Sequence, residues 1–511
     1  MFLGRTQEIA LQKACAKFNL QPEQLELTQD EDVLDTWFSS ALFPFSVFGW
    51  PDNTPDLQRF YPGHLLETGH DIMFFWVARM VFMGVKFLGK LPFKDVYFHA
   101  MVRDAHGRKM SKSLGNVIDP LDMIYGVSLE YLHQRLVDNA ALDPSEVQKA
   151  KDGQRKDFPN GIPECGADAL RFALCAYTLQ GRDINLDIQR VESYRHFCNK
   201  IWNAFKLTLD LLGHDFSPVA LNSEFTDKLP SMDRWILSKL SFAVNQCETG
   251  FANYNFPMVT TAIYQFWLYE LCDKYLEYIK PVIRQQNEGY VSCQQTLQLC
   301  VDVALKLLSP FMPFLTEELW QRLPRLDDSP SIHVSRYPLV SQVSFLRNEI
   351  LEEKETLAFK VVREVRSTRA NYEVNKNAKL SVYIADFVNE DARESIALFV
   401  DFMSTVSGSQ FHIRGDDIPQ KGCAISILPF CKVHVLLEGL IDKEKEQTKL
   451  NLKLQQTSDQ MQKLNEQMAL PGYNTNVPLG VRTKNAEKHE ELQRQLKEIE
   501  NAIVILSHLE I

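Results

Sequence analysis

The stretch that most constrains the fold is a short polar loop between a strand-like run and a helix start. Residues 108–116 hold two lysines, Lys109 and Lys112, together with two serines and a glycine, whereas the run at 96–102 is mostly apolar. Glycine permits close backbone approach, and lysine supplies a point charge that suits phosphate. The loop can therefore close on a polyphosphate, although its residues alone could equally form a solvated basic turn.

A second junction of the same kind lies upstream. Residues 64–68 predict a strand, Gly69 a turn and residues 71–88 an apolar helix. A strand that passes through a glycine into a helix is the common nucleotide site of doubly wound sheets, at the carboxyl ends of the strands. We therefore expect a parallel sheet in which this strand end and that of residues 95–102 face one ligand.

The remainder of the chain is predicted to be mostly helical. Residues 138–165 are polar and rich in turn formers, which predicts an exposed excursion. Repeated amphipathic patterns over 188–323 predict a helix bundle, and 341–440 a small α/β unit. In the helix at 194–212 we place Trp202 on the apolar side. The Trp and Phe residues of the bundle are interpreted mostly as core, not as base-stacking platforms.

Two runs with heptad spacing mark the end of the chain. Apolar or small residues recur every three or four positions at Leu450, Leu454, Thr457, Met461, Leu464 and Met468, and again at Leu492, Leu496, Ile499, Ile503 and Leu506. Pro471, Gly472 and Pro478 lie between the runs, where no helix interior tolerates proline. This pattern predicts an antiparallel two-helix hairpin, and a dimerisation coil is the alternative.

Composition limits the class of protein. A chain of 511 residues is expected to hold several domains, and its net charge of −11 leaves room for RNA binding through a local basic face. The ten cysteines include no Cys-x-x-Cys pair, so structural zinc is not expected. Scattered free cysteines suit a reducing compartment, which we expect for this protein. No apolar run is long enough to span a bilayer. We expect a cytoplasmic protein that has no membrane partner.

The loop and its surroundings resemble a known family. Residues 109–113 read Lys-Met-Ser-Lys-Ser, which matches the signature of the class I aminoacyl-tRNA synthetases letter for letter. Residues 32–40, 67–72, 74–80 and 161–166 also match, and together they resemble the valyl-tRNA synthetase family, most closely its animal cytosolic type. The resemblance covers nearly the whole chain. The isoleucyl- and leucyl-tRNA synthetases, which share the loop, are the nearest alternatives.

The resemblance implies an α/β fold followed by a mainly α part, in four domains. These are the second half of a Rossmann-like catalytic domain (1–187), a helical anticodon-binding domain (188–340), a small α/β domain (341–440) and a coiled-coil arm that binds tRNA (441–511). It implies ATP-dependent attachment of valine to tRNA(Val) through a valyl-adenylate. The implied partners are tRNA(Val), valine and ATP with Mg²⁺, and other proteins of the translation machinery are possible partners.

The resemblance also implies site residues. Those of the ATP site are Lys109, Met110, Ser111, Lys112, Ser113, Gly69, Asp71 and His99, with Lys109 and Lys112 as the catalytic pair. The valine pocket would hold Trp37, Asp71 and Ile72, and tRNA would contact Arg195 and Lys200. Plain structural interpretations stand beside these roles: core packing for Trp37, a helix-dipole partner for Asp71 and a satisfied strand histidine for His99.

One part of the family pattern is missing from the sequence. The family's second signature, His-x-Gly-His, does not occur, and neither does its editing domain. We therefore expect a C-terminal portion of a synthetase that is inactive alone. Two rival interpretations are a non-catalytic tRNA-binding fragment and a scaffold protein whose coiled coil binds other proteins.

Overall fold

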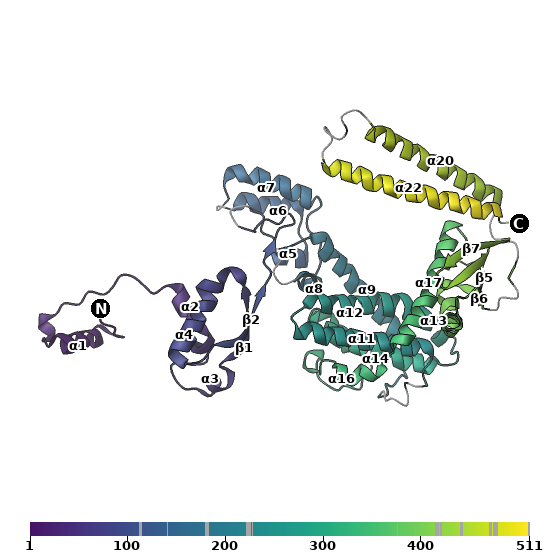
Figure 1. Ribbon diagram of the computed structural model, residues 1–511. Helices are drawn as coiled ribbons and strands as arrows, with labels where there is room; N and C mark the ends of the chain where they lie inside the picture. Colours follow the sequence, from purple (N-terminus) through teal and green to yellow (C-terminus); the bar gives the residue numbers. More distant parts are fainter. Residues whose placement is uncertain are drawn as a thin grey trace. The chain divides into compact units, whose positions relative to one another are not determined.

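The computed structural model describes residues 1–111, 115–139, 142–178, 183–220, 226, 228–375, 377–413, 418–419, 422–439, 443–469, 473 and 479–508 (Figure 1). The chain forms two compact units. The first consists of residues 1–109 and 178–186, and the second of residues 110–177 and 187–511. The division into four domains stays a prediction. Among the described helices, none has both the length and the apolar character that a bilayer crossing requires.

The first unit is built on a short parallel sheet. Its elements are α1 (Gln7–Phe18), η1 (Pro22–Gln24), α2 (Thr36–Ser46), α3 (Pro55–Phe60), β1 (Gly63–Gly69), η2 (His70–Ile72), η3 (Met73–Val77), α4 (Ala78–Leu88), β2 (Phe93–His99), β3 (Val102–Arg103) and β4 (Ile184–Asn185). β1 and β2 pair in parallel from Gly63 opposite Phe93 to Gly69 opposite His99. Val77 and Met80 pack on Phe93 and cover one face of this sheet. The predicted strand–glycine–helix unit is confirmed.

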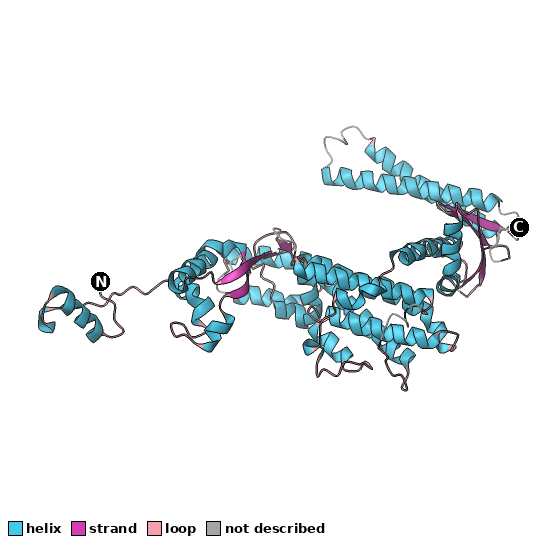
Figure 2. Cartoon of the chain, turned by 60° about the horizontal axis from the view of Figure 1, so that its bottom comes forward, coloured by secondary structure: helices cyan, strands magenta, loops and turns pink. Residues whose placement is uncertain are grey.

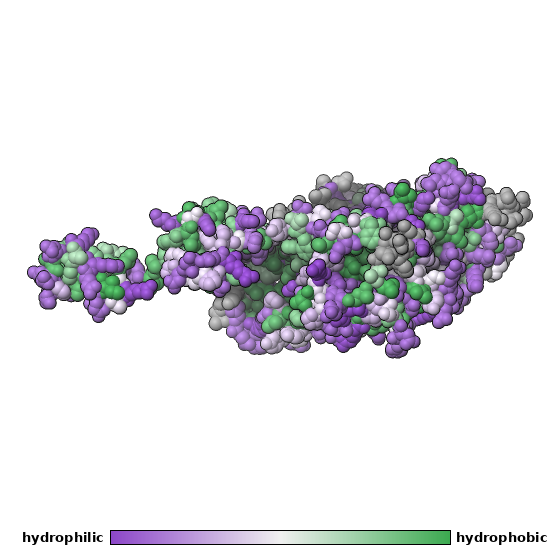
Figure 3. Space-filling model, turned by 90° about the horizontal axis from the view of Figure 1, so that it is seen from below, coloured by the Kyte–Doolittle hydropathy of each residue, from purple (hydrophilic) through white to green (hydrophobic). Residues whose placement is uncertain are grey.

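The helix after Gly69 begins irregularly. A 3₁₀ turn, η2, leads into a π-helical turn, η3, and regular α-helix starts only at Ala78. Large apolar side chains of η3 and α4 are exposed, such as Phe74 at 74% and Phe82 at 66%. Figure 3 shows hydrophobic side chains at the surface of the part that holds α2 and α4. Exposed apolar side chains in such numbers are typical of an interaction surface or an aggregation liability.

The predicted end of the strand at 95–102 is wrong. β2 stops at His99, and the separate strand β3 pairs in parallel with β4. The reason is the partner strand: β1 ends at Gly69, where its chain turns into η2, so residues after His99 have no neighbour on that side. Ile184 donates its N–H to Met101 O at 2.8 Å instead. The lysine loop thus follows β3, in a different sheet from β1 and β2.

The second unit opens with four helices, α5 (Pro120–Tyr125), α6 (Leu129–Asp138), α7 (Pro144–Asp157) and α8 (Ala167–Tyr177). α7 lies within the stretch 138–165, which the sequence predicts as an exposed excursion, and its described residues are exposed or half-buried. Polar residues one turn apart support the helix, as in the ion pair of 2.7 Å between Lys149 and Glu146. α7 also packs on α6.

A helix bundle follows, as predicted (Figure 2). It comprises α9 (Ile188–Leu212), α11 (Ser231–Ala252), α12 (Phe256–Gln265), η4 (Phe266–Tyr275), α13 (Leu276–Arg284), α14 (Tyr290–Leu308), α15 (Pro313–Trp320), η5 (Ile332–Val334), α16 (Val340–Val343) and η6 (Ser344–Leu346). Trp235, Trp267 and Trp320 are fully buried, which confirms their interpretation as core. Trp202 is 41% exposed, so its placement on the apolar side of the helix is wrong.

The last elements are a mixed sheet and a helical hairpin. α17 (Glu349–Asn371), β5 (Leu380–Ala385), α18 (Glu390–Leu398), α19 (Val400–Ser407), β6 (Ser409–His412), β7 (Cys423–Leu428) and β8 (Cys431–Leu436) make the predicted α/β unit, with strand order β6-β5-β8-β7. α20 (Lys443–Met468) and α22 (Leu479–His508) pack on each other. Thr457, Leu464, Leu492 and Ile499, all at predicted heptad positions, are buried.

Candidate functional site

The carboxyl ends of β1 and β2 bring Gly69 and His99 together. The two residues face each other in the ladder, and Asp71 follows in η2. A Cβ atom on Gly69 would lie 2.7 Å from Asp71 Oδ1 and 3.2 Å from Met101 Sδ. Glycine at this position thus lets the exposed Asp71 carboxylate fold back closely over the strand end. This places a carboxylate beside a strand end, where doubly wound sheets hold nucleotides.

Two acceptors orient the His99 imidazole. Its Nε2 atom lies 3.4 Å from Glu67 Oε1, and its Nδ1 atom lies 3.1 Å from the carbonyl oxygen of Ala100. The ring is about one-third exposed, so it remains accessible at the end of the strand. Protein contacts thus account for the histidine, and its role near adenine stays a prediction.

Trp37 and Ile72 flank the irregular helix start. Trp37 lies in the first turn of α2, where Asp35 accepts its backbone N–H at 2.7 Å, and its ring centroid is 6.3 Å from that of Phe75. Both Trp37 and Ile72 are half-buried. Ile72 directly precedes the π-helical turn η3, and such turns are frequent at functional sites. A role of the two side chains in a valine pocket stays a prediction.

The approach to the lysine loop is a tight turn held by Asp104. Its buried carboxylate accepts the backbone N–H groups of His106 and Arg108, at 3.0 and 2.8 Å, and the Arg108 Nε–H at 2.7 Å. The Asp104 N–H in turn donates to Arg108 O at 3.1 Å. Lys109, next along the chain, forms a β-bridge with Arg103, which is ion-paired with Asp183. These contacts fix the backbone on which Lys109 stands.

Sequence reasoning missed Arg103, Asp104 and Asp183. The turn carried a local signal, since aspartate three residues before a glycine is a common turn sequence, and Gly107 has a φ of +77°. The Arg103–Asp183 pair joins residues far apart in the sequence, which no local pattern predicts.

The rest of the lysine loop belongs to the second unit. Lys112 and Ser113 lie outside the described residues. Met110 and Ser111 are described, and the Ser111 N–H donates to Asn116 Oδ1 at 3.0 Å. Gly115 has a φ of +63°, and a Cβ atom there would meet Leu136 Cδ2 at 2.9 Å. The end of the loop therefore needs glycine both for its backbone and for its packing.

Arg195 and Lys200, the two residues on α9 that are predicted to contact tRNA, differ in how far other protein groups engage their charges. Lys200 Nζ lies 2.9 Å from Asp273 Oδ1. The half-buried Arg195 lines a cavity of about 480 Å³ formed by α8, α9 and α15. Since an ion pair already engages Lys200, Arg195 has the freer charge. Their contact with tRNA stays a prediction.

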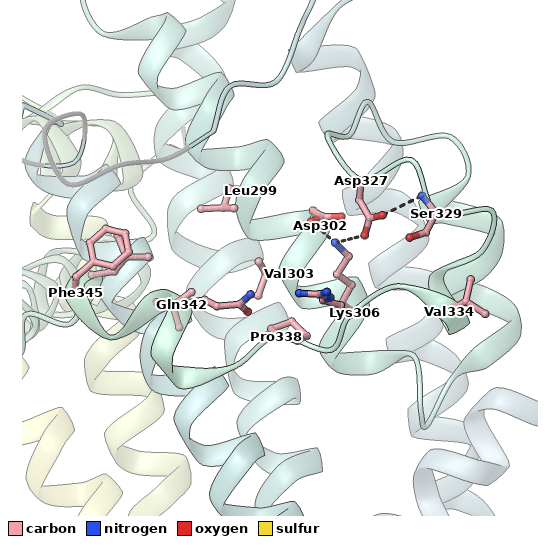
Figure 4. Close-up of a pocket in the computed structure, with 13 residues that line it drawn as sticks. Leu299, Asp302, Val303, Lys306, Asp327, Ser329, Val334, Pro338, Gln342 and Phe345 are labelled. Carbon is pink, nitrogen blue, oxygen red and sulfur yellow. Dashed lines mark hydrogen bonds and ion pairs between the residues drawn. The ribbon is translucent and has the colours of Figure 1, made fainter.

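Another cavity of the bundle, about 570 Å³, is lined by apolar residues, by Arg336 and by the paired charges of Asp302, Lys306 and Asp327. Figure 4 shows Lys306 between Asp302 and Asp327, and its Nζ atom lies 3.0 and 3.1 Å from their carboxylates. The hydrogen bond from Ser329, aided by Lys306, holds the pKa of Asp327 at about 2. Asp327 therefore stays charged and paired with Lys306. Among the described residues no three His, Cys, Asp or Glu side chains gather as a metal cluster.

Comparison with known families matches two parts of the chain. The sequence model of the tRNA synthetases class I (I, L, M and V) matches residues 3–187. The model of the anticodon-binding domain of tRNA ligase matches residues 233–384. The first match contains both strand ends and the lysine loop, and the second contains most of the bundle.

Curated relatives match almost the whole chain. The valine--tRNA ligase of Rattus norvegicus is 51% identical over 99% of this chain and 40% of its own length. The valine--tRNA ligase of Homo sapiens is 50% identical over 99% of this chain and 40% of its own length. The valine--tRNA ligase of Caenorhabditis elegans is 44% identical over 99% of this chain and 49% of its own length. The chain thus spans less than half the length of these relatives. Residues 3–187 thus match the class I tRNA synthetases, and over almost its whole length the chain is homologous to part of the valine--tRNA ligases.

Proposed function

We propose that this chain is the part of a valine--tRNA ligase that carries the lysine loop of the ATP site and the tRNA-binding helices. The observation that carries the proposal is the 51% identity to a valine--tRNA ligase over 99% of the chain. The geometry at Gly69, Asp71 and His99 supports it, because it offers a nucleotide a parallel strand end, a carboxylate and an imidazole. The proposal places the enzyme in the cytoplasm.

The first reaction is activation of valine. The valine carboxylate attacks the α-phosphorus of ATP, a P–O bond forms, and the bond to pyrophosphate breaks. Negative charge then develops on the leaving phosphates, and Lys109 and Lys112 stabilise it electrostatically. Mg²⁺ enters with ATP as the substrate complex. Gly69 and Asp71 hold the ribose, His99 lies by adenine, Met110, Ser111 and Ser113 complete the loop, and Trp37 and Ile72 contact valine.

The second reaction transfers the valyl group to the terminal ribose of tRNA. The adenylate's acyl–phosphate bond breaks, an ester bond to the ribose forms, and AMP leaves. Arg195 and Lys200 on α9 contact the tRNA, and the hairpin α20–α22 acts as a coiled-coil arm on the same RNA. The buried heptad positions Leu464 and Leu492 support pairing within the hairpin rather than with a second chain.

Valine-dependent ATP–pyrophosphate exchange tests the proposal. In the protein that joins this chain to a His-x-Gly-His segment, Lys112→Ala should lower the exchange rate by about 10²- to 10³-fold, the range for one preorganised electrostatic donor. The affinity for valine should barely change, and Lys86→Ala, an exposed lysine at the end of α4, should leave exchange intact. Unchanged exchange in Lys112→Ala would refute the role of the loop.

A non-catalytic tRNA-binding fragment is the second candidate function. It is favoured by the missing His-x-Gly-His motif, since class I chemistry holds ATP between two loops. The purified 511-residue chain should therefore bind tRNA without catalysing exchange. Exchange by this chain above a Lys112→Ala control would show that the missing motif is dispensable.

A further inference from the structure

The cavity at Arg195 has an uneven lining. It lies within the second unit, and α9 supplies Arg195, Asn199 and Trp202 to its wall. Residues four and three positions apart lie on one face of a helix, so a cation, an amide and an indole follow one another along this wall. Within the described part of the chain, none of these three side chains makes a hydrogen bond or an ion pair. Trp202 is 41% exposed, unlike the buried tryptophans of the bundle core.

The polar groups of the facing wall are already engaged. The Asp168 carboxylate accepts the backbone N–H groups of Phe314 and Leu315, at 3.3 and 2.6 Å. The Glu318 carboxylate pairs with Arg322 at 2.7 Å. The two carboxylates are acceptors only, so among the described charged and amide side chains of the lining the donors open to a phosphate lie on α9.

The remaining wall consists of small residues and leaves room beside Arg195. It is formed by Gly166, Ala167 and Ala169 at the start of α8. A Cβ atom on Gly166, whose φ is +82°, would lie 3.5 Å from Arg195 Nη1. Small side chains here let a flat group reach the guanidinium. The volume of about 480 Å³ lies in the range of cavities that hold small organic ligands.

We propose that this cavity binds one unstacked nucleotide of a tRNA, with its phosphate on Arg195, its base stacked on Trp202 and its base edge at Asn199. Arginine matches phosphate geometry, and an exposed indole is the usual platform for an unpaired base. The inference rests on the proposed function and deepens it. The α8 and α9 walls lie outside residues 233–384, which match the anticodon-binding domain, whereas the α15 wall lies inside them.

The test measures binding of a transcribed valine tRNA to the full chain as salt is varied. Trp202→Leu should weaken binding by about 5- to 100-fold, whereas Trp202→Phe, which keeps a ring, should lose far less. Arg195→Gln should lower the salt slope by about one phosphate contact. Phe345→Leu, an aromatic residue that is 51% exposed at another cavity, and Arg284→Gln, a surface arginine, are the matched controls and should bind like the wild type.

A cross-link locates the nucleotide. Photoactivated 4-thiouridine in the tRNA should attach to the tryptic peptide 201–206, which contains Trp202. If the wild type binds tRNA but the α9 variants bind equally well, the cavity is not the subsite and the proposed function stands. If the wild type binds no tRNA, the proposed function itself fails. If AMP or GMP alone binds as tightly as tRNA, the cavity serves a free nucleotide and the inference is overturned.

Discussion

A buried carboxylate in the bundle makes a quantitative prediction about pH. Asp233, near the start of α11, is fully buried. Its Oδ1 atom accepts the Tyr275 hydroxyl at 2.7 Å, its Oδ2 atom accepts the Ser292 hydroxyl at 2.8 Å, and the Cys293 thiol lies 3.5 Å away. Burial outweighs these hydrogen bonds and raises the pKa of Asp233 to about 6 from 3.8. The folded protein therefore holds this proton more tightly than the unfolded chain does.

The sign of the pH dependence follows directly. Because the folded pKa is the higher one, the stabilising effect of the proton is complete below pH 3.8 and is lost as pH rises through about 6. At 1.36 kcal/mol per pH unit, the difference between the two pKa values corresponds to about 3 kcal/mol of unfolding free energy. Above pH 6 the loss is complete and constant.

Urea unfolding of the wild type and Asp233→Asn between about pH 3.5 and 7 measures this effect. The fluorescence of Trp235, Trp267 and Trp320 reports on the bundle core. The asparagine does not titrate, so the stability of the wild type relative to the variant should fall by about 3 kcal/mol across the window. Asp215→Asn, at an exposed position, should keep the pH dependence of the wild type. A relative stability that is flat or rises with pH would refute the reasoning.

Three further predictions concern the strand end, the hairpin and tRNA binding. Gly69→Ala should change the stability of the first unit by less than about 1 kcal/mol, because only the side chains of Asp71 and Met101 must move. It should nevertheless abolish ATP binding, measured at equilibrium in the protein that joins this chain to a His-x-Gly-His segment. Gly63→Ala, where an added Cβ meets nothing closer than 3.6 Å, should bind ATP normally. Leu464→Ala should destabilise the hairpin by about 2–4 kcal/mol when its unfolding is followed by circular dichroism, whereas Leu452→Ala at an exposed position of the same helix should not. The affinity for tRNA should fall more than about tenfold between roughly 50 and 200 mM salt, and a salt-independent affinity would contradict phosphate contacts from α9.

Local pattern predicted the elements whose causes are local. The strand-like run before Gly69 and the apolar helix after it sufficed to predict the β1–η2 junction. The end of β2 could not be predicted in the same way, because it depends on where β1 stops. α7 was missed because its composition resembles a loop, whereas residues one turn apart stabilise it as a helix.

The site shows the same division between local and long-range causes. The lysines of the loop stand out in the sequence, but the Asp104 turn acts through the backbone N–H groups that it holds, and only the folded chain reveals these. Trp202 was misjudged because helical periodicity shows which side chains share a face. It does not show whether another helix covers that face.

The parallel register of β1 and β2 also governs which insertions and deletions the first unit can accept. Gly69 and His99 are opposite each other only because the ladder runs unbroken from Gly63 and Phe93. One residue added inside either strand would turn every later side chain to the other face, so that a neighbour of His99 would stand opposite Gly69. Residues added at Gly89 or Lys90, in the connection after α4, leave this alignment unchanged. Length variation among relatives should therefore collect in that connection, while the spacing within each strand stays constant.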